Sequence, residues 1–182
     1  YLEGSVAMSR ESATKAQAAD RLDNALVDEE GINFEIIELL FFAYRDFISD
    51  PDAILETKGF GRAHHRVVHF VNREPGLTVA ALLDTLMITK QSLARVLKQL
   101  IDSGYVHQVA GPEDRRQRRL YPTRKGRELA LALARPQSRR IAKALSGMGS
   151  GERAAVTEFL NGMINRDSGE ASGEPGSASD DV

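Results

Sequence analysis

The stretch TKQSLARVLKQLIDSGY, residues 89–105, constrains the fold more than any other part of this chain. Thr89 can cap a helix start, because its hydroxyl accepts a backbone N–H, and Gly104 is a typical helix terminator. The helical i, i+3, i+4, i+7 and i+8 spacing is followed by Leu93, Val96, Leu97, Leu100 and Ile101. The opposite face has no acid before Asp102 and carries Lys90, Gln91, Arg95, Lys98 and Gln99. The pattern predicts an amphipathic helix over 89–103 whose outer face is rich in hydrogen-bond donors. An ordinary solvated helix is the alternative.

Charge is unevenly distributed along the 182 residues. Residues 35–166 contain 21 of the 24 lysines and arginines but only 14 of the 26 acids, which gives this segment a net charge of +7. A basic domain between acidic ends has a reason to bind a polyanion. The chain has no cysteine, so disulfides, thiolate metal sites and cysteine redox sensing are excluded.

The two ends differ from the middle in composition. Residues 1–32 are polar and lack a sustained apolar period, so we expect a flexible extension, in which residues 1–7 before Met8 are consistent with an expression remnant. Residues 167–182 are glycine, serine and acid, which predicts a disordered tail. One folded domain is expected at 33–166. No secretory signal is visible, so a soluble, cytoplasmic protein is expected.

Residues 33–50 form a predicted helix that ends at Pro51. Its apolar residues cover nearly all faces, so it must be buried on several sides. A second subunit is the expected cover, and burial within one chain is the alternative. The helix is too short, and too interrupted by Glu38, Arg45 and Asp46, to cross a membrane, and no membrane partner is expected.

Two further short helices are predicted before residue 89. One spans residues 62–73, and the other spans 79–86 and is capped by Thr78. A brief turn at Met87 then leads into the 89–103 helix. Two short helices joined in this way, the second basic on its outside, are a helix-turn-helix candidate.

A β-hairpin is predicted after Gly104. Residues 105–109 form its first strand, a loop opens at Gly111 and Pro112, and the return strand contains Leu120 and Tyr121. The fold class is therefore mostly α with a small β-hairpin wing, a winged helix-turn-helix with additional helices at both ends. A run of charge is usually a solvated face, but the neighbouring basic helix favours phosphate or minor-groove contact. The basic residues assigned to the hairpin tip are Arg115, Arg116, Arg118 and Arg119.

The C-terminal part reads as two helices. Thr123 caps a long one that runs to about Leu145 with a kink expected at Pro136. Glycines 147 and 149 break it, and Ser150 starts the last helix. The apolar stripe of this helix is Val156, Phe159, Leu160, Met163 and Ile164.

Over residues 34–165 the order of elements resembles that of the MarR family of transcriptional regulators. The wing of that family commonly reads Asp-x-Arg followed by Leu-Thr-x-x-Gly, and the matching positions here are Asp114, Arg116, Thr123 and Gly126. Pro122 stands where the family usually has leucine; this departure concerns only the local packing of the second wing strand, because proline is tolerated at a strand end. The segment 61–106 is also similar to one proteobacterial subgroup of the family.

The resemblance implies a homodimer that binds double-stranded DNA. The helices at 33–50 and 124–166 would interlock between two chains, and the lobe at 62–123 would present one winged helix-turn-helix to each half-site. The family also implies a pocket for a small-molecule effector between the dimerisation helices and this lobe. The spacing of residues does not identify that effector.

The residue types suggest individual contacts with DNA. Gln91 can pair with adenine and Arg95 with guanine in the major groove. Arg116 is assigned to the minor groove and held by Asp114, and a purely structural pair of these two residues is the alternative. Other predicted contacts, mainly to phosphates, are Thr89, Lys90, Ser92, Lys98, Arg115, Arg118 and Arg119.

The histidines permit two interpretations. His65 and His69 have the i, i+4 spacing of metal ligands, but Arg66 occupies the place of a zincin's catalytic glutamate and no acid completes the set. They are better interpreted as solvated or hydrogen-bonded groups near the effector pocket. His64, His65 and His69 are assigned to this pocket, although His64 faces a different side from the other two. We expect no metal and no cofactor.

The residues also bear on two rival function classes. An enzyme is disfavoured because the chain lacks a phosphate-binding glycine loop, a nucleophile elbow and paired carboxylates in an apolar setting, so no catalytic residue is assigned. A winged-helix module that binds protein or RNA would share the fold but lack base-specific readout of DNA. Competition with random DNA separates this alternative from a regulator.

Overall fold

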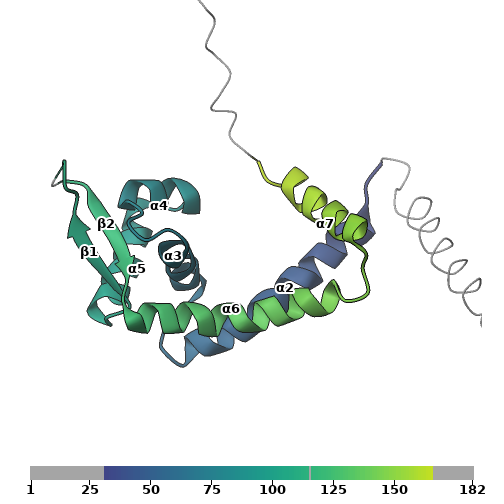
Figure 1. The fold of residues 1–182 in the computed structure, drawn as a ribbon, viewed down its shortest axis with the longest axis horizontal. Helices are drawn as coiled ribbons and strands as arrows, with labels where there is room; N and C mark the ends of the chain where they lie inside the picture. Colours follow the sequence, from purple (N-terminus) through teal and green to yellow (C-terminus); the bar gives the residue numbers. More distant parts are fainter. Residues whose placement is uncertain (1–30, 115, 166–182) are drawn as a thin grey trace, which may run out of the picture. The chain divides into compact units, whose positions relative to one another are not determined.

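Residues 31–114 and 116–165 are described by the structure, which is a computed structural model (Figure 1). The predicted extension up to residue 30, Arg115 and the acidic tail at 167–182 lie outside the described residues. The chain divides into two compact units between Arg140 and Ile141. In chain order the elements are α2 (Phe34–Glu56), α3 (Arg62–Arg73), α4 (Val79–Leu86), α5 (Lys90–Asp102), β1 (Val106–Ala110), β2 (Arg118–Pro122), α6 (Arg124–Ala144) and α7 (Ser150–Gly162).

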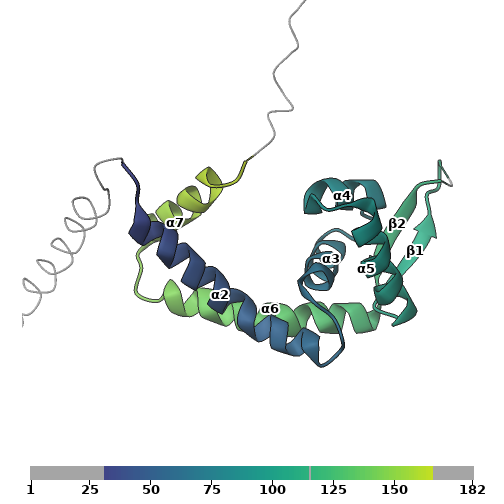
Figure 2. The same ribbon diagram turned by 180° about the vertical axis from the view of Figure 1, so that it is seen from behind.

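The core of the first unit forms where the apolar faces of α3, α4 and α5 meet. The hairpin lies beside α4 and α5 in both views of the ribbon (Figures 1 and 2). Burying one such aliphatic side chain contributes about 1.5–3 kcal/mol. The predicted stripe of the 89–103 helix is confirmed as its core face, with Ile101 packed at the margin. Buried side chains of this core include Val67, Val71, Leu82, Leu86, Leu93, Val96, Leu97, Leu100 and Leu120.

Side-chain caps fix where α4 and α5 begin. The Thr78 hydroxyl accepts the backbone N–H of Ala81 at 3.1 Å, and the Thr89 hydroxyl accepts that of Ser92 at 3.2 Å. Between the two helices, Met87 adopts the left-handed conformation with φ 49° and ψ 47°. Such a cap replaces a hydrogen bond that the first helical turn cannot make. The predicted helix-turn-helix is therefore confirmed by the capped first turns of α4 and α5 and by the turn between them.

The wing is an antiparallel hairpin with an additional segment paired to its second strand. Val106 lies opposite Pro122 and Ala110 opposite Arg118. On the other side of β2, the Leu120 N–H donates to the Leu77 carbonyl at 2.9 Å, and Thr78 forms a bridge with residue 119. Pro122 is accepted because it ends the strand, where a missing N–H costs little.

A backbone contact joins the hairpin to α6. The Thr123 hydroxyl accepts the Gly126 N–H at 3.0 Å and donates to the carbonyls of Gly104 and Tyr105. A Cβ placed on Gly126 would lie 2.0 Å from the carbonyl oxygen of Tyr105. Only glycine permits this approach, which gives the Thr-x-x-Gly pattern a physical cause.

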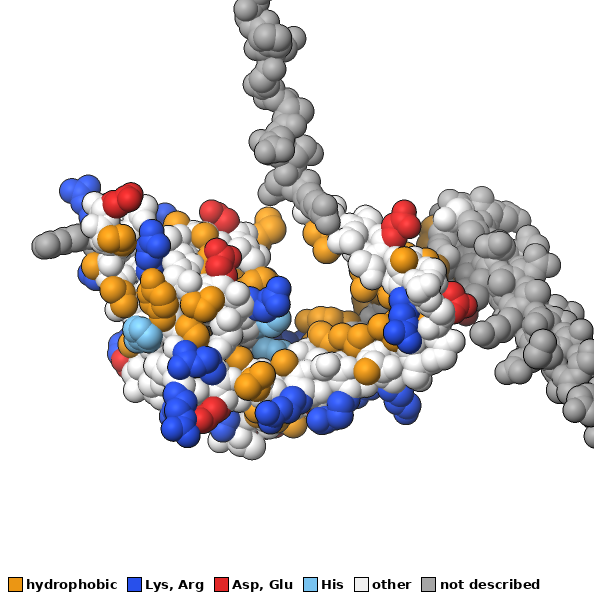
Figure 3. All heavy atoms as spheres, viewed as in Figure 1, with side chains coloured by type: hydrophobic (Ala, Val, Ile, Leu, Met, Phe, Trp, Pro, Cys, Tyr) orange, Lys and Arg blue, Asp and Glu red, His pale blue; other side chains and the backbone are white. Residues whose placement is uncertain are grey.

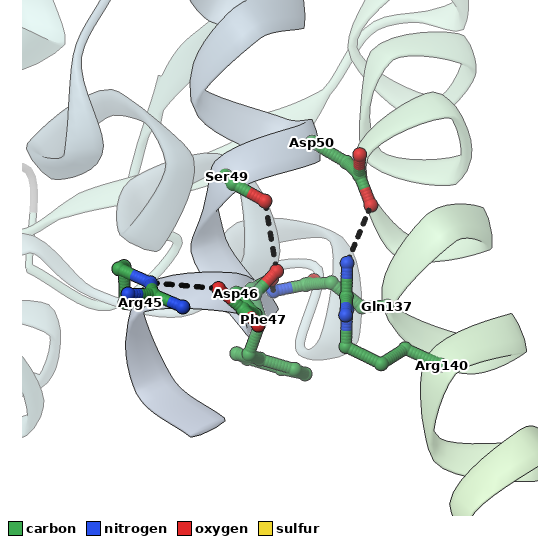
Figure 4. A network of polar contacts seen from close by, with 7 residues as sticks. All are labelled: Arg45, Asp46, Phe47, Ser49, Asp50, Gln137 and Arg140. Atoms are coloured by element: carbon green, nitrogen blue, oxygen red, sulfur yellow. Dashed lines mark hydrogen bonds and ion pairs between the residues drawn. The ribbon is translucent and has the colours of Figure 1, made fainter. Parts of the chain in front are cut away.

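The prediction that Pro51 ends the first helix is wrong, because α2 continues through it to Glu56. A proline inside a helix removes the N–H that would bond the carbonyl four residues earlier, here that of Phe47. The Gln137 amide of α6 donates to this carbonyl at 3.4 Å, and Arg140 contacts Asp50 at 3.4 Å (Figure 4). The ring of Pro51 is itself buried. The carbonyl that proline leaves without a helical donor thus receives a hydrogen bond from another helix, and residues 52–56 are the last part of α2. Residues 124–144 likewise run through Pro136 as one helix.

Among the described residues, most of α2 is exposed or only partly buried. Ile48, Pro51 and Leu55 are its buried residues, all in its second half. Figure 3 shows hydrophobic side chains at the surface along the region of α2 and α6. The first half of α2 contains no buried residue in the described part of the chain. Exposed apolar side chains of α2 are Phe34, Ile37, Leu39, Phe41, Phe42 and Tyr44.

The second unit contains α7, which begins at Ser150 as predicted. The Gly149 N–H donates to the Glu152 carboxylate at 2.7 Å and closes the helix start. Of the predicted stripe, Phe159 and Leu160 lie on the helix and are exposed, whereas Met163 and Ile164 follow its end. Among the described helices, none is long and apolar enough to cross a membrane.

Candidate nucleic-acid interface

The outer face of α5 is cationic. Lys90, Gln91 and Arg95 are exposed, while the opposite face of the same helix is buried in the core. The first turn of α5 contains no acid. Side chains near the start of such a helix are those that reach base edges when it enters a major groove. The structure thus presents these three donors together on one surface.

Thr89 and Ser92, two further predicted contacts, are engaged with each other. The Thr89 hydroxyl accepts the Ser92 N–H and donates to the Ser92 hydroxyl at 3.0 Å. In the structure these two side chains fix the start of α5. Lys98 is exposed and forms an ion pair with Asp102 one turn later. Exposed pairs of this kind are weak, so the Lys98 ammonium stays available to a phosphate.

Gln99 and His64 form an internal contact that the sequence did not reveal. The Gly61 N–H donates to His64 Nδ1 at 3.1 Å, so Nε2 carries the proton and donates to the Gln99 side-chain oxygen at 2.7 Å. The ring of His64 stacks on Phe60 with centroids 4.6 Å apart, and His64 is buried. His64 therefore joins α3 to α5. It is not among the residues that line the cavity formed in part by His65 and His69.

Asp114 shapes the wing tip through the backbone. Its carboxylate accepts the backbone N–H of Arg116 at 2.8 Å, and its carbonyl accepts that of Gln117 at 3.0 Å. In the described part of the chain no ion pair joins Asp114 to the Arg116 guanidinium. The expected contact between Asp114 and Arg116 is thus a hydrogen bond to the Arg116 backbone within the turn. The exposed Arg116 guanidinium forms no ion pair with the described residues.

The assignment of Arg118 and Arg119 to the hairpin tip is wrong. The Gly111 N–H donates to the Gln117 carbonyl at 2.9 Å, which closes the turn, so β2 begins at Arg118. Alternation along the strand then leaves Arg118 exposed and Arg119 half-buried. The Arg119 Nε is buried without a hydrogen-bond partner among the described residues. Arg115 lies outside the described residues.

A cavity of about 370 Å³ lies next to this lobe, among α2, α3 and α6. His65 and His69 line it with Arg62 and Arg66, all from α3. Burial lowers the pKa of His65, and the nearby His69 lowers it further while Asp52 opposes the change. Burial also lowers the pKa of His69. These two predicted pocket residues are therefore brought together, and their neutral forms are favoured.

No group of three or more His, Cys, Asp or Glu side chains gathers within residues 31–114 and 116–165 in a way that could hold a metal ion. The His65 and His69 pair instead faces a cavity whose charged neighbours are arginines. Arginine repels a cation, so these residues suit a neutral or anionic partner better than a metal.

A basic, exposed second helix next to an arginine-bearing hairpin defines a winged helix-turn-helix DNA-binding protein. Residues 58–117 match the MarR family. The chain is similar to the HTH-type transcriptional regulator PetP of Rhodobacter capsulatus, with 47% identity over 129 residues, 71% of this chain and 78% of that protein. The chain therefore belongs to the MarR family of transcriptional regulators. Its relatives are regulators and not enzymes, and the subgroup expected from residues 61–106 is confirmed.

Solved structures show the same fold. FabT of Streptococcus pneumoniae in complex with DNA has a TM-score of 0.62 and 23% identity, and the match covers 70% of this chain and 91% of that one. A MarR transcriptional regulator from Methanosarcina mazei has a TM-score of 0.58 and 27% identity, with coverage of 70% and 92%. The mostly helical fold with a two-stranded wing is thereby confirmed.

Proposed function

We propose that two copies of this chain bind an inverted repeat in double-stranded DNA, each with α5 in a major groove. The observation that carries the proposal is the exposed face of α5. Lys90, Gln91 and Arg95 lie on this face, opposite the residues of α5 that are buried in the core. In a dimer of this type the half-site centres lie about 10 bp, or roughly 34 Å, apart.

Base readout is assigned to two side chains of α5. Gln91 can bond bidentately to adenine, and Arg95 can do the same with guanine. Lys90, Ser92 and Lys98 are assigned to phosphates, because they flank these two along the helix. Thr89 supports the same surface by capping α5.

The wing is proposed to lie near the minor groove. Arg116 supports this role because Asp114 holds its backbone and leaves its guanidinium exposed. Arg119 is half-buried on β2 and is kept as a proposed phosphate contact; because its Nε is buried, a phosphate would have to bond the terminal nitrogens of the guanidinium. Arg115 and Arg118 complete the proposed set.

Dimerisation is proposed to cover α2. Phe34 and Phe41 are 61% and 69% exposed, which is unusual for large aromatic side chains on a helix with so many other apolar residues. A second copy would supply the missing cover. Sedimentation at several protein concentrations tests this, and a monomer at every concentration contradicts it. Control of DNA binding by a small-molecule effector is proposed alongside.

A band-shift titration tests the DNA-binding proposal. Wild-type protein selects a preferred duplex from random sequences, and its affinity is then measured with random DNA as competitor over a range of salt. Arg95→Ala is expected to lose about 1–3 kcal/mol on the selected duplex and to relax preference at one base pair. Arg139→Ala, which removes an equal charge from α6, is the matched control and should leave the preference unchanged.

The outcome separates base readout from the rival function. Equal losses for Arg95→Ala on selected and random DNA contradict a base-reading role. Steeply salt-dependent binding without sequence preference favours a module for protein or RNA. Arg116→Ala is expected to weaken all duplexes alike and to reduce the salt slope by about 1.

A further inference from the structure

The row of polar side chains on the outer face of α5 extends one turn beyond the two residues assigned to base readout. Gln91, Arg95 and Gln99 have the spacing i, i+4 and i+8, and all three are exposed. Gln99 therefore lies about 12 Å further along the helix axis than Gln91. A ligand that covers the first two members of this row has the third member next to it.

His64 determines which end of the Gln99 amide faces outward. The backbone N–H of Gly61 can only donate, so His64 Nδ1, at 3.1 Å, is an accepting nitrogen. An imidazole with an accepting nitrogen has one N–H, which is therefore on Nε2, and only the amide oxygen of Gln99 can accept it, at 2.7 Å. With this oxygen engaged, the NH2 group is the free end of the amide and forms no hydrogen bond with the described residues.

The ring of His64 is held against reversal of this arrangement. It is 8% exposed and stacks on Phe60, with centroids 4.6 Å apart and an angle of 11° between the ring planes. Phe60 in turn packs edge-on against Tyr105, with 5.4 Å between centroids. A flipped imidazole would set a C–H against the Gly61 N–H and lose that hydrogen bond. The orientation of the Gln99 amide is thus set inside the lobe and not by a ligand.

A glutamine fixed in this way differs from a free glutamine in what it can recognise. The amide of Gln91 has no partner among the described residues, so it can offer the donor and the acceptor that adenine requires. Gln99 offers donors only, and its partner must supply an acceptor. Phosphate oxygens are acceptors, and glutamine side chains commonly donate to them in DNA complexes. The chemistry of Gln99 therefore fits the DNA backbone better than it fits an adenine.

The position of Gln99 along α5 favours the same partner. A recognition helix contacts base edges with its N-terminal residues, and the major groove that it enters is about 12 Å wide. A residue about 12 Å beyond Gln91 therefore comes near the edge of the groove, where the phosphates lie. The neighbouring Lys98 is exposed and adds a positive charge on the same turn.

We propose that Gln99 donates to one backbone phosphate in each half-site and that His64 is the positioning residue that holds the Gln99 amide for this contact. This role of Gln99 rests on the proposed DNA-binding function. His64 does not touch DNA. It removes the alternative orientation of Gln99, in which the amide oxygen would face the phosphate and be repelled by it.

The orientation is tested on the protein without DNA. Proton–nitrogen correlation spectra of the histidine rings show which nitrogen carries the proton, and His64→Phe identifies the signals of His64 by their loss. The proton is expected on Nε2. A proton on Nδ1, or exchange between the two nitrogens, overturns the positioning role of His64 whatever the DNA measurements give.

Band shifts on the selected duplex test the phosphate contact. Gln99→Ala is expected to lower affinity about tenfold, because each chain of the dimer loses one hydrogen bond. The slope of affinity against salt should stay unchanged, because a neutral side chain releases no counterion. Lys98→Ala removes a charge and should reduce that slope by about 1. Ser138→Ala, which truncates an exposed polar side chain of α6, is the control and should leave affinity unchanged.

Gln99→Glu separates the outward donors from the inward acceptor. Its carboxylate keeps an oxygen for His64 Nε2 but presents no donor and repels a phosphate, so a larger loss than that of Gln99→Ala is expected. It also carries the comparison if thermal melting shows Gln99→Ala to be unfolded. Unchanged affinity in the folded Gln99 variants refutes the contact.

Neutral methylphosphonates placed at single positions of the duplex locate the contact. In the wild type, one position in each half-site is expected to be more sensitive than its neighbours, and Gln99→Ala should abolish this excess. His64→Phe, which keeps a ring to stack on Phe60, is expected to lower affinity about two- to threefold in the wild type and not at all in Gln99→Ala. Equal costs of His64→Phe in both backgrounds refute positioning through Gln99.

The sequence preference of the wild type is measured first. Its absence refutes the proposed function and with it the phosphate contact, whereas the proton on His64 Nε2 is decided by the spectra alone. A wild type that prefers its duplex, together with a methylphosphonate pattern that Gln99→Ala leaves unchanged, refutes the role of Gln99 and leaves the proposed function standing.

Discussion

The lobe around α5 and the first half of α2 are both rich in apolar residues, yet only one of them is covered. Leu82 and Leu100 of the lobe are fully buried, whereas Phe34 and Phe41 of α2 are more than half exposed. The comparison shows that hydrophobic content alone does not say where burial occurs. The lobe holds its stability within one chain, and under the proposed dimer the stability of α2 depends on protein concentration.

The largest expected effect is a loss of stability at the close backbone contact between Gly126 and Tyr105. Gly126→Ala places a Cβ 2.0 Å from the Tyr105 carbonyl oxygen, which backbone cannot avoid without moving. We expect a loss of at least about 3 kcal/mol in the free energy of unfolding, measured by denaturant titration. Gly151→Ala on α7 is the control, since a Cβ there meets nothing within 4 Å and should be neutral or slightly stabilising.

Truncating one side chain in each region tests the comparison directly. Leu100→Ala is expected to cost about 2–5 kcal/mol at every protein concentration, because it opens a cavity in the core. Phe41→Ala is expected to weaken self-association, by about 1 kcal/mol or more, and to leave the unfolding of dilute protein nearly unchanged. Denaturation at several concentrations distinguishes the two. A concentration-independent loss for Phe41→Ala contradicts the proposed role of α2.

A smaller effect is expected at the start of α5. Thr89→Ala removes the hydroxyl that accepts the Ser92 N–H and is expected to cost about 1 kcal/mol. Thr89→Ser keeps the hydroxyl and should retain most of the stability. If both variants melt as the wild type does, the cap does not stabilise α5.

The smallest expected effect concerns the cavity histidines and appears only when stability is measured as a function of pH. Because the pKa of His65 is lowered in the folded state, the unfolded chain binds its proton more readily. The contribution to stability is therefore complete above the unfolded pKa of about 6.5 and declines as pH falls through the folded value. His65→Gln should flatten this decline in denaturation midpoints between about pH 7.5 and 5.5, and an unchanged slope contradicts the assignment.

Periodicity and capping chemistry predicted the local structure well. The bounds of α3, the caps at Thr78 and Thr89, and the hairpin all follow from neighbours in sequence. The errors at Pro51 and Arg118 have a different origin. Pro51 is tolerated because Gln137, far away along the chain, meets the freed carbonyl, and the strand position of Arg118 depends on which hydrogen bond closes the turn.

The site was predicted less completely for the same reason. Lys90, Gln91 and Arg95 could be assigned because helical spacing alone places them opposite the core. The bonds of His64 to Gln99 and of Arg66 to the Leu86 carbonyl join elements whose relative placement no local pattern gives. The only sign that His64 is internal was its position on the buried face of its helix, next to Phe60.

The missing side chain at Gly126 has a mechanical consequence. The backbone of Gly126 lies directly against the backbone of Tyr105, so no side chain between them can change rotamer to make room. The start of α6 therefore cannot slide over the end of the helix-turn-helix. At 1.5 Å per residue, α6 is a rod of about 30 Å. A displacement of the first turn of α6 is therefore expected to move the Tyr105 backbone, at the end of the helix-turn-helix, with it.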